Sequence, residues 1–147
     1  MSRPPLPSSL IKPSMETRFY IDFDWWRETG QDLRTMLVQL CEEYGGPDAA
    51  SISPDAMVDW VDPQTAEVRR VDGLMYVVLS RCSQHEEFIT ERTALVEAIF
   101  RALLASGNRP LTPLELAQRV GRPPEVILRT LSGRQVYKGI RPYFEED

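Results

Sequence analysis

The stretch TALVEAIFRALLASGNRPLTPLELAQRVGRPPEVILRTLSGRQVYKGIRP, residues 93–142, decides the predicted fold. Its pattern indicates three short helices, with a tight turn between the second and the third, and a small strand-forming tail after them. The first helix carries a broad apolar stripe, and such a stripe needs the other two helices as cover. We therefore expect the three helices to share one core.

The second helix has the clearest start signal in the chain. Thr112 can accept a hydrogen bond from the amide of Glu115, and the Glu115 side chain can reach back to the Thr112 amide, which makes a capping box. Leu111 and Leu116 stand at the positions of a hydrophobic staple around this cap. Gly121 can take the left-handed conformation that ends a helix. The sequence therefore predicts a helix between Thr112 and Gly121.

The first and third helices are bounded by weaker signals. Thr90 is the expected cap of the first helix, which ends at Ser106-Gly107. The third helix starts at Pro123-Pro124 and stops at Ser132-Gly133. One core is expected to hold six apolar side chains from this region: Ile99, Leu103, Leu111, Leu116, Ile127 and Leu131.

The tail after the third helix favours a short hairpin. Residues 135–137 and 140–141 flank Lys138-Gly139, and Pro142 ends the pairing capacity of the tail. Three helices followed by a stunted wing resemble a winged helix-turn-helix module, over residues 93–142 and roughly the last third of the chain. The resemblance implies a three-helix fold that binds DNA in some proteins and other proteins elsewhere, because fold alone does not fix function.

Charge is divided unevenly along the chain, whose formal net charge is −5. Residues 105–143 hold seven basic and two acidic side chains, a net charge of +5, whereas residues 16–100 hold seven basic and seventeen acidic ones, a net charge of −10. The basic part is suited to a phosphate backbone, which would repel the acidic part. An acidic region docked on a basic one within the same molecule explains the division equally well.

A nucleic-acid interface would draw on the basic residues of the third helix and the tail. Arg129 would contact a base from the helix, although the nearby Glu125 would repel phosphates. The candidate binding residues are Arg122, Arg129, Arg134, Lys138 and Arg141.

The N-terminal part is predicted to form a small α+β layer. Residues 18–23 alternate as a half-buried strand, and Asp24 is expected to cap a single helix that runs to Tyr44. Ser53-Pro54 indicates a further helix that buries Trp60, and residues 67–71 form a short strand before a helix capped by Asp72.

The predicted fold class is therefore α+β, mostly helical, in three parts. Residues 1–15 form a flexible proline-rich arm, residues 16–87 the N-terminal layer, and residues 88–147 the winged-helix-like module. No stretch has the length of a membrane span or the apolar centre of a signal peptide, so the expected location is the cytoplasm.

Two groups of residues have the spacing of metal ligands. Asp22 and Asp24 follow an apolar strand, a layout used by metal-dependent phosphoryl-transfer enzymes, but a cap and a solvent-facing carboxylate explain the same letters. Cys82 and His85, with Cys41, would supply three zinc ligands where structural sites normally have four. We predict no bound zinc, no other cofactor and no catalytic residues.

Trp25 and Trp26 are adjacent near a helix start, so both cannot point inward. This pair is the expected protein-contact site, unless it packs on the C-terminal module.

The first functional hypothesis is a non-enzymatic regulator that binds nucleic acid, most simply DNA. The second is an interaction or assembly module that binds a partner protein or a second copy of itself, and a metal-dependent enzyme is a distant third. A continuous basic face would favour the first hypothesis, and an apolar patch bearing a tryptophan the second.

Overall fold

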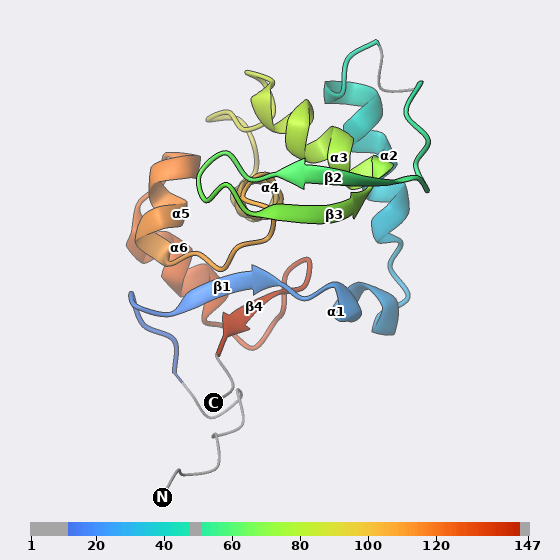
Figure 1. The fold of residues 1–147 in the computed structure, drawn as a ribbon. Helices are drawn as coiled ribbons and strands as arrows, with labels where there is room; N and C mark the ends of the chain where they lie inside the picture. Colours follow the sequence, from blue (N-terminus) through green and yellow to red (C-terminus); the bar gives the residue numbers. More distant parts are fainter. Residues whose placement is uncertain (1–11, 48–50, 145–147) are drawn as a thin grey trace, which may run out of the picture.

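The computed structural model describes residues 12–47 and 51–144 and has the mixed, mostly helical fold expected from the sequence. In this part of the chain, no helix has both the length and the apolar character that crossing a membrane requires. The elements, in chain order (Figure 1), are β1 (Arg18–Ile21), α1 (Phe23–Glu28), α2 (Leu33–Tyr44), β2 (Met57–Val61), β3 (Val68–Asp72), α3 (Gly73–Ser80), the 3-10 helix η3 (Cys82–Gln84), α4 (Leu95–Ala105), α5 (Pro113–Val120), α6 (Pro124–Leu131) and β4 (Ile140–Tyr143).

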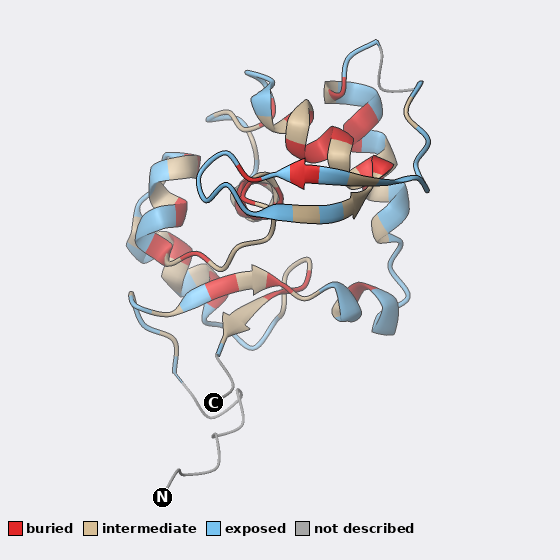
Figure 2. Cartoon of the chain, in the orientation of Figure 1, coloured by how far each residue is buried: buried red, intermediate tan, exposed pale blue. Residues whose placement is uncertain are grey.

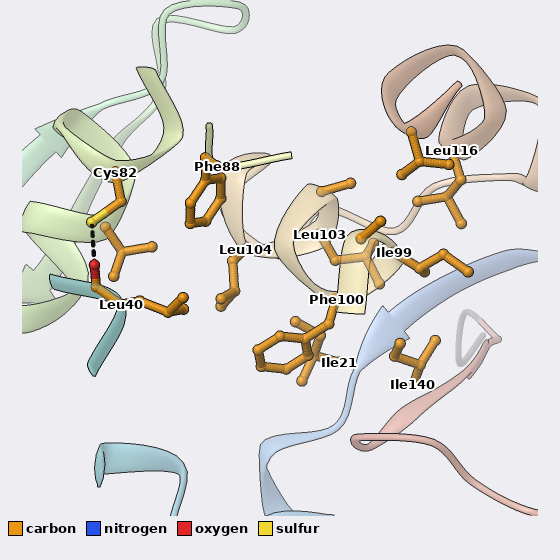
Figure 3. Close-up of a cluster of buried hydrophobic side chains, with 14 of the residues drawn as sticks. Ile21, Leu40, Cys82, Phe88, Ile99, Phe100, Leu103, Leu104, Leu116 and Ile140 are labelled. Atoms are coloured by element: carbon orange, nitrogen blue, oxygen red, sulfur yellow. Dashed lines mark hydrogen bonds between the residues drawn. The ribbon is translucent and has the colours of Figure 1, made fainter. Parts of the chain in front are cut away.

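Helix α4 lies at the centre of the molecule, with the other elements around it (Figures 1 and 2). Ile99, Phe100 and Leu103 of this helix are fully buried. Figure 3 shows how side chains from α2, η3, α5, β1 and β4 converge on α4. The six residues predicted to share one core do so: Ile99, Leu103, Leu111, Leu116, Ile127 and Leu131. This core also takes in Leu37, Leu40 and Val78 of the N-terminal half, so it crosses the predicted boundary between residues 87 and 88.

The predicted hairpin in the C-terminal tail is wrong. Strand β4 pairs antiparallel with β1, from Arg18 opposite Tyr143 to Ile21 opposite Ile140. Phe19 also exchanges two backbone hydrogen bonds with Leu111, of 2.8 and 2.9 Å, so β1 lies between Leu111 and β4. The N-terminal strand β1 therefore supplies the pairing partner that the tail was expected to find in its own residues.

The turn before β4 explains why the tail does not fold back on itself. Lys138 and Gly139 both have positive φ angles, of 53° and 77°, and they direct the chain toward Asp22, whose amide donates to the Gly139 carbonyl. A Cβ atom at position 139 would lie 2.8 Å from the Asp22 carbonyl oxygen. Only glycine fits both this conformation and this close approach.

The helical predictions for residues 112–131 are confirmed. Thr112 and Glu115 form the complete capping box, and Gly121 ends α5 in the left-handed conformation with φ of 69°. The predicted cap of the first helix is wrong, because α4 begins only at Leu95. Thr90 and Thr93 instead form a turn, in which the Thr93 amide donates to the Thr90 carbonyl and the Thr90 amide to the Thr93 hydroxyl.

The single helix expected between Asp24 and Tyr44 is two helices, α1 and α2. Gly30, with φ of 73°, interrupts the helical path between them. Asp22, not Asp24, caps α1 by accepting from the Asp24 amide, and Asp32 caps α2 by accepting from the Thr35 amide. The break lets α1 turn toward the C-terminal tail while α2 packs on α3.

The prediction of a helix after Ser53-Pro54 is wrong, because residues 57–61 form strand β2. Strand β2 pairs antiparallel with β3, and β3 confirms the predicted strand near residues 67–71. Trp60 points inward and is 7% exposed, whereas its neighbours Asp59 and Val61 are exposed. This alternation is that of a strand with one covered face. Asp72 then caps α3, as predicted, by accepting from the Met75 amide at 2.7 Å.

Candidate interaction surfaces

Two of the five basic candidates lie free on the surface of the helical unit, α4 to α6. Arg129, in the last turn of α6, and Arg134, just after that helix, are exposed. Among the residues that the structure describes, neither forms an ion pair or a hydrogen bond. Glu125, in the first turn of α6, is exposed as well. The outer surface of α6 therefore carries both signs of charge.

Arg122 is used within the chain. Its guanidinium donates to the Val120 carbonyl at 3.3 Å, to the Glu91 carbonyl at 3.0 Å and to the Thr93 carbonyl. These bonds fasten the turn between α5 and α6 to the loop that leads into α4. The side chain therefore has a structural role, and a phosphate could bind it only by replacing these hydrogen bonds.

Lys138 is also committed to contacts inside the molecule. Its ammonium lies 3.0 Å from Glu97 of α4 and within 6.0 Å of the ring centroids of Trp26 and Phe100. Glu97 binds Arg101 at 3.0 Å through its other oxygen. Because these three charges are all less than one third exposed, the cluster links the tail to α4 more firmly than a surface ion pair would.

Arg141 pairs with Asp22 at 3.1 Å, beside the junction of β1 and β4. Three of the five basic candidates, Arg122, Lys138 and Arg141, thus bind groups of this chain. Lys138 binds the Glu97 carboxylate of α4, and Arg141 binds the Asp22 carboxylate near β1. The intramolecular docking of acidic on basic segments therefore accounts for part of the charge division in the sequence. Of the five candidates, only Arg129 and Arg134 remain free in the part of the chain that the structure describes, so Arg134 is the one tail candidate left to contact a phosphate.

The two adjacent tryptophans face different surroundings. Trp26 is 4% exposed, packs on Phe100 and donates from Nε1 to the Lys138 carbonyl at 2.9 Å. It therefore anchors α1 to the C-terminal tail, which is the intramolecular alternative considered for this pair. Trp25 is half-buried and meets Trp26 edge-on at 5.5 Å between ring centroids. Only Trp25 of the predicted contact pair remains partly accessible.

An open cleft of about 580 Å³ lies between the end of α2, the loop after η3 and α4. Some of its polar groups are bound within the chain. Arg101 donates to the Tyr44 hydroxyl at 3.1 Å and the Phe88 carbonyl at 2.8 Å, while His85 accepts from the Glu87 amide at 3.0 Å. Burial acts against the charge of Arg101, but its bonds to Tyr44 and Glu97 raise the pKa of the guanidinium.

The metal-ligand spacings do not correspond to a cluster of ligands. Cys41 and Cys82 are buried in the core and meet there. The Cys41 thiol is also directed at the Leu74 carbonyl at 3.6 Å, and the Cys82 thiol at the Leu40 carbonyl, also at 3.6 Å (Figure 3 shows the latter). A hydrogen bond to Cys82, and then burial, raise the pKa of the Cys41 thiol. His85 is exposed and meets Tyr44 edge-on instead. Residues 12–47 and 51–144 contain no group of three His, Cys, Asp or Glu side chains placed to hold a metal.

The surface that sequence reasoning missed is the outer face of the β2–β3 hairpin. Met57, Val61 and Val68 are 52, 55 and 60% exposed on this face, and Val61 lies directly opposite Val68. Asp59 and Arg70 lie opposite each other between them and are both exposed. The segment MVDWV has no polar–apolar alternation, because both its outward and its inward positions carry apolar residues, and the Ser53-Pro54 pair before it favoured a helix.

The inner face of the hairpin fixes it to the helical unit. The Trp60 ring packs against Gly107, just after α4, so closely that a Cβ atom at position 107 would lie 3.2 Å from it. Arg69 donates to the Gly107 carbonyl. Arg69 also lies 5.9 Å from the centroid of the Trp60 ring. The hairpin is therefore held by its inner face while its outer face is presented to the surroundings. Comparisons of the chain with protein-family models, with curated proteins and with solved structures find no match.

Proposed function

We propose that the protein is a non-enzymatic interaction module, in which the core around α4 to α6 holds the β2–β3 hairpin and its outer face contacts a partner protein. The observation that carries this proposal is the exposure of Met57, Val61 and Val68, each more than half accessible on one face of the same hairpin. Grouped apolar side chains at the surface of a soluble domain mark contact sites more often than isolated ones do.

The surrounding chemistry supports a contact surface over a catalytic one. Arg101 in the cleft is bound to the Tyr44 hydroxyl and the Phe88 carbonyl, and the buried thiols of Cys41 and Cys82 lie in the core. Three of the five basic candidates bind groups of this chain, so these three side chains are less available to a phosphate backbone.

Site-specific photo-crosslinking in the cells that produce the protein tests this proposal. A benzophenone amino acid at position 61 should give a covalent adduct, because its side chain would lie in the contact. The same probe at position 125, which is exposed on α6, is the matched control and should give none. Absence of an adduct at position 61 would contradict the hairpin as a contact surface, and an adduct only at position 125 would move the contact to the helices.

Nucleic-acid binding is a second candidate, supported by the free side chains of Arg129 and Arg134 next to the helix-turn-helix. Duplex DNA and RNA would be titrated at about 50 mM salt, where contacts to phosphates are strongest. Replacing both arginines with alanine should lower the salt slope by about two units, because each phosphate contact contributes about 0.9. Arg92→Ala, on the exposed loop before α4, is the control and should leave the slope unchanged. A wild-type chain that binds neither nucleic acid would exclude this candidate.

A further inference from the structure

We infer that the partner of the β2–β3 hairpin is a second copy of this chain, joined through a two-fold axis that runs parallel to the strands and between them. The inference rests on the proposed function. Its evidence is the arrangement of the outward side chains, which complement a rotated copy of themselves.

The central pair of charges is the first step of the argument. Asp59 and Arg70 occupy opposite positions of the ladder, and both are exposed. No ion pair between them occurs within the described part of the chain, and neither residue has another charged partner there. One free negative charge and one free positive charge therefore stand side by side on the surface.

A two-fold axis parallel to the strands matches these charges across the contact. Rotation about it lays β2 of one copy on β3 of the other, so that Asp59 meets the partner's Arg70 and Arg70 meets the partner's Asp59. A two-fold contact is made of the same surface patch on both copies, which requires this kind of self-complementarity. An axis across the strands would instead oppose Asp59 to the partner's Asp59.

The same rotation also matches the two exposed valines, whereas Met57, which lies opposite Asp72 in the ladder, comes onto the partner's Asp72. Val61 and Val68 lie opposite each other in the ladder, so the axis brings Val61 onto the partner's Val68. Burying these exposed aliphatic groups favours association. The hairpin is only about 17 Å long and 10 Å wide, a small footprint beside the roughly 800 Å² per partner of a stable complex. The dimer is therefore weak and depends on protein concentration.

Charge reversal tests the pairing directly with the full chain. Asp59→Arg leaves two cations side by side on the hairpin, and Arg70→Asp leaves two carboxylates there. Each variant alone should therefore self-associate at least tenfold more weakly than the wild type in sedimentation equilibrium. An equimolar mixture of the two variants should regain the dimer, because every cation in one chain then meets a carboxylate in the other. Circular dichroism verifies that each variant keeps its fold.

Matched controls and outcomes make the test decisive. Glu125→Arg and Arg129→Asp produce the same changes in net charge on α6, and both should dimerise like the wild type. A wild-type chain that stays monomeric up to millimolar concentration, or a mixture no more associated than its components, would overturn the inference. If position 61 then crosslinks a different protein, the proposed interaction module still stands; if it crosslinks nothing, the proposed function fails as well.

Discussion

The helical unit, α4 to α6, and the β2–β3 hairpin distribute their apolar residues in opposite ways. In α5 and α6 the large apolar side chains Leu116, Ile127 and Leu131 are buried, and only Leu114 among the large ones is more than half exposed. In the hairpin, Trp60 is buried while Met57, Val61 and Val68 face outward. A helix of two turns can place nearly all its apolar residues on one stripe, whereas a two-stranded sheet has two faces and only one of them covered. The helical unit thus buries most of its large apolar side chains, whereas the β2–β3 hairpin leaves three of its own exposed.

The comparison is tested most strongly by removing the same side chain from the two sides of α5. Leu116→Ala deletes a fully buried group, so the free energy of unfolding should fall by about 2 to 5 kcal/mol, depending on how far the site collapses. Leu114→Ala, two residues away and 56% exposed, should change it by less than about 0.5 kcal/mol. Urea denaturation of both variants measures the difference. Equal losses would mean that α5 does not have one buried side.

A second prediction concerns the tie between the helical unit and β1. Gly139→Ala forces a side chain into a conformation with φ of 77° and against the Asp22 carbonyl, so we expect a loss of about 1 to 3 kcal/mol in the free energy of unfolding. Gly133→Ala is the control, because a Cβ atom there meets nothing within 4 Å. Thermal denaturation measures both variants. A neutral Gly139→Ala would contradict the pairing of β4 with β1.

The capping box provides a smaller, local effect. Thr112→Ala removes the hydroxyl that accepts from the Glu115 amide at 3.2 Å, and the expected loss is about 1 kcal/mol. Hydrogen exchange should show faster opening of the first turn of α5 with little change in β2 and β3. Opening that spreads equally to the hairpin would show that the two regions are not separable.

The smallest effect expected is the response of the hairpin turn to acid. Burial opposes the charge of Asp62, but hydrogen bonds from the Gln64 and Thr65 amides lower its pKa below the ordinary 3.8. A carboxylate whose pKa is lowered by folding stabilises the folded state above pH 3.8, and this contribution is lost as the pH falls through the folded pKa. Nuclear magnetic resonance should therefore show the turn loosening below pH 3.8, and Asp62→Asn should abolish that dependence. A wild-type turn that stays unchanged down to about pH 2 would contradict a stabilising role of the Asp62 carboxylate.

The parts of the fold that were predictable depend on neighbours in the sequence. The Thr112–Glu115 box, the Gly121 stop and the Asp72 cap join residues within a few positions of one another, and all three were predicted. Ser53-Pro54 misled because it is as good a helix start as those signals. Residues 57–61 form a strand because they pair with β3 across the turn at Asp62 and bury one face on α3. This pairing joins residues that a local helix signal does not take into account.

The free and occupied charges were not predictable for a different reason. Lys138 and Glu97, like Arg141 and Asp22, are far apart in the chain and meet only through the path of the tail beside α4 and β1. A count of charges finds a basic segment but not which of its members already have partners. Arg129 and Arg134 look no different in the sequence from Arg122, whose guanidinium is consumed by backbone carbonyls.

The pairing of β1 with β4 sets the order in which the protein can be completed during synthesis. Asp22 and Arg141 are 119 residues apart, and at about 5 to 20 residues per second a ribosome needs on the order of ten seconds to make that length. Until then Phe19 and Ile21 have no final neighbour on that side, and the emerging N-terminal strand presents an unpaired edge. The helices can form as they appear, but the first strand made is among the last to find its place.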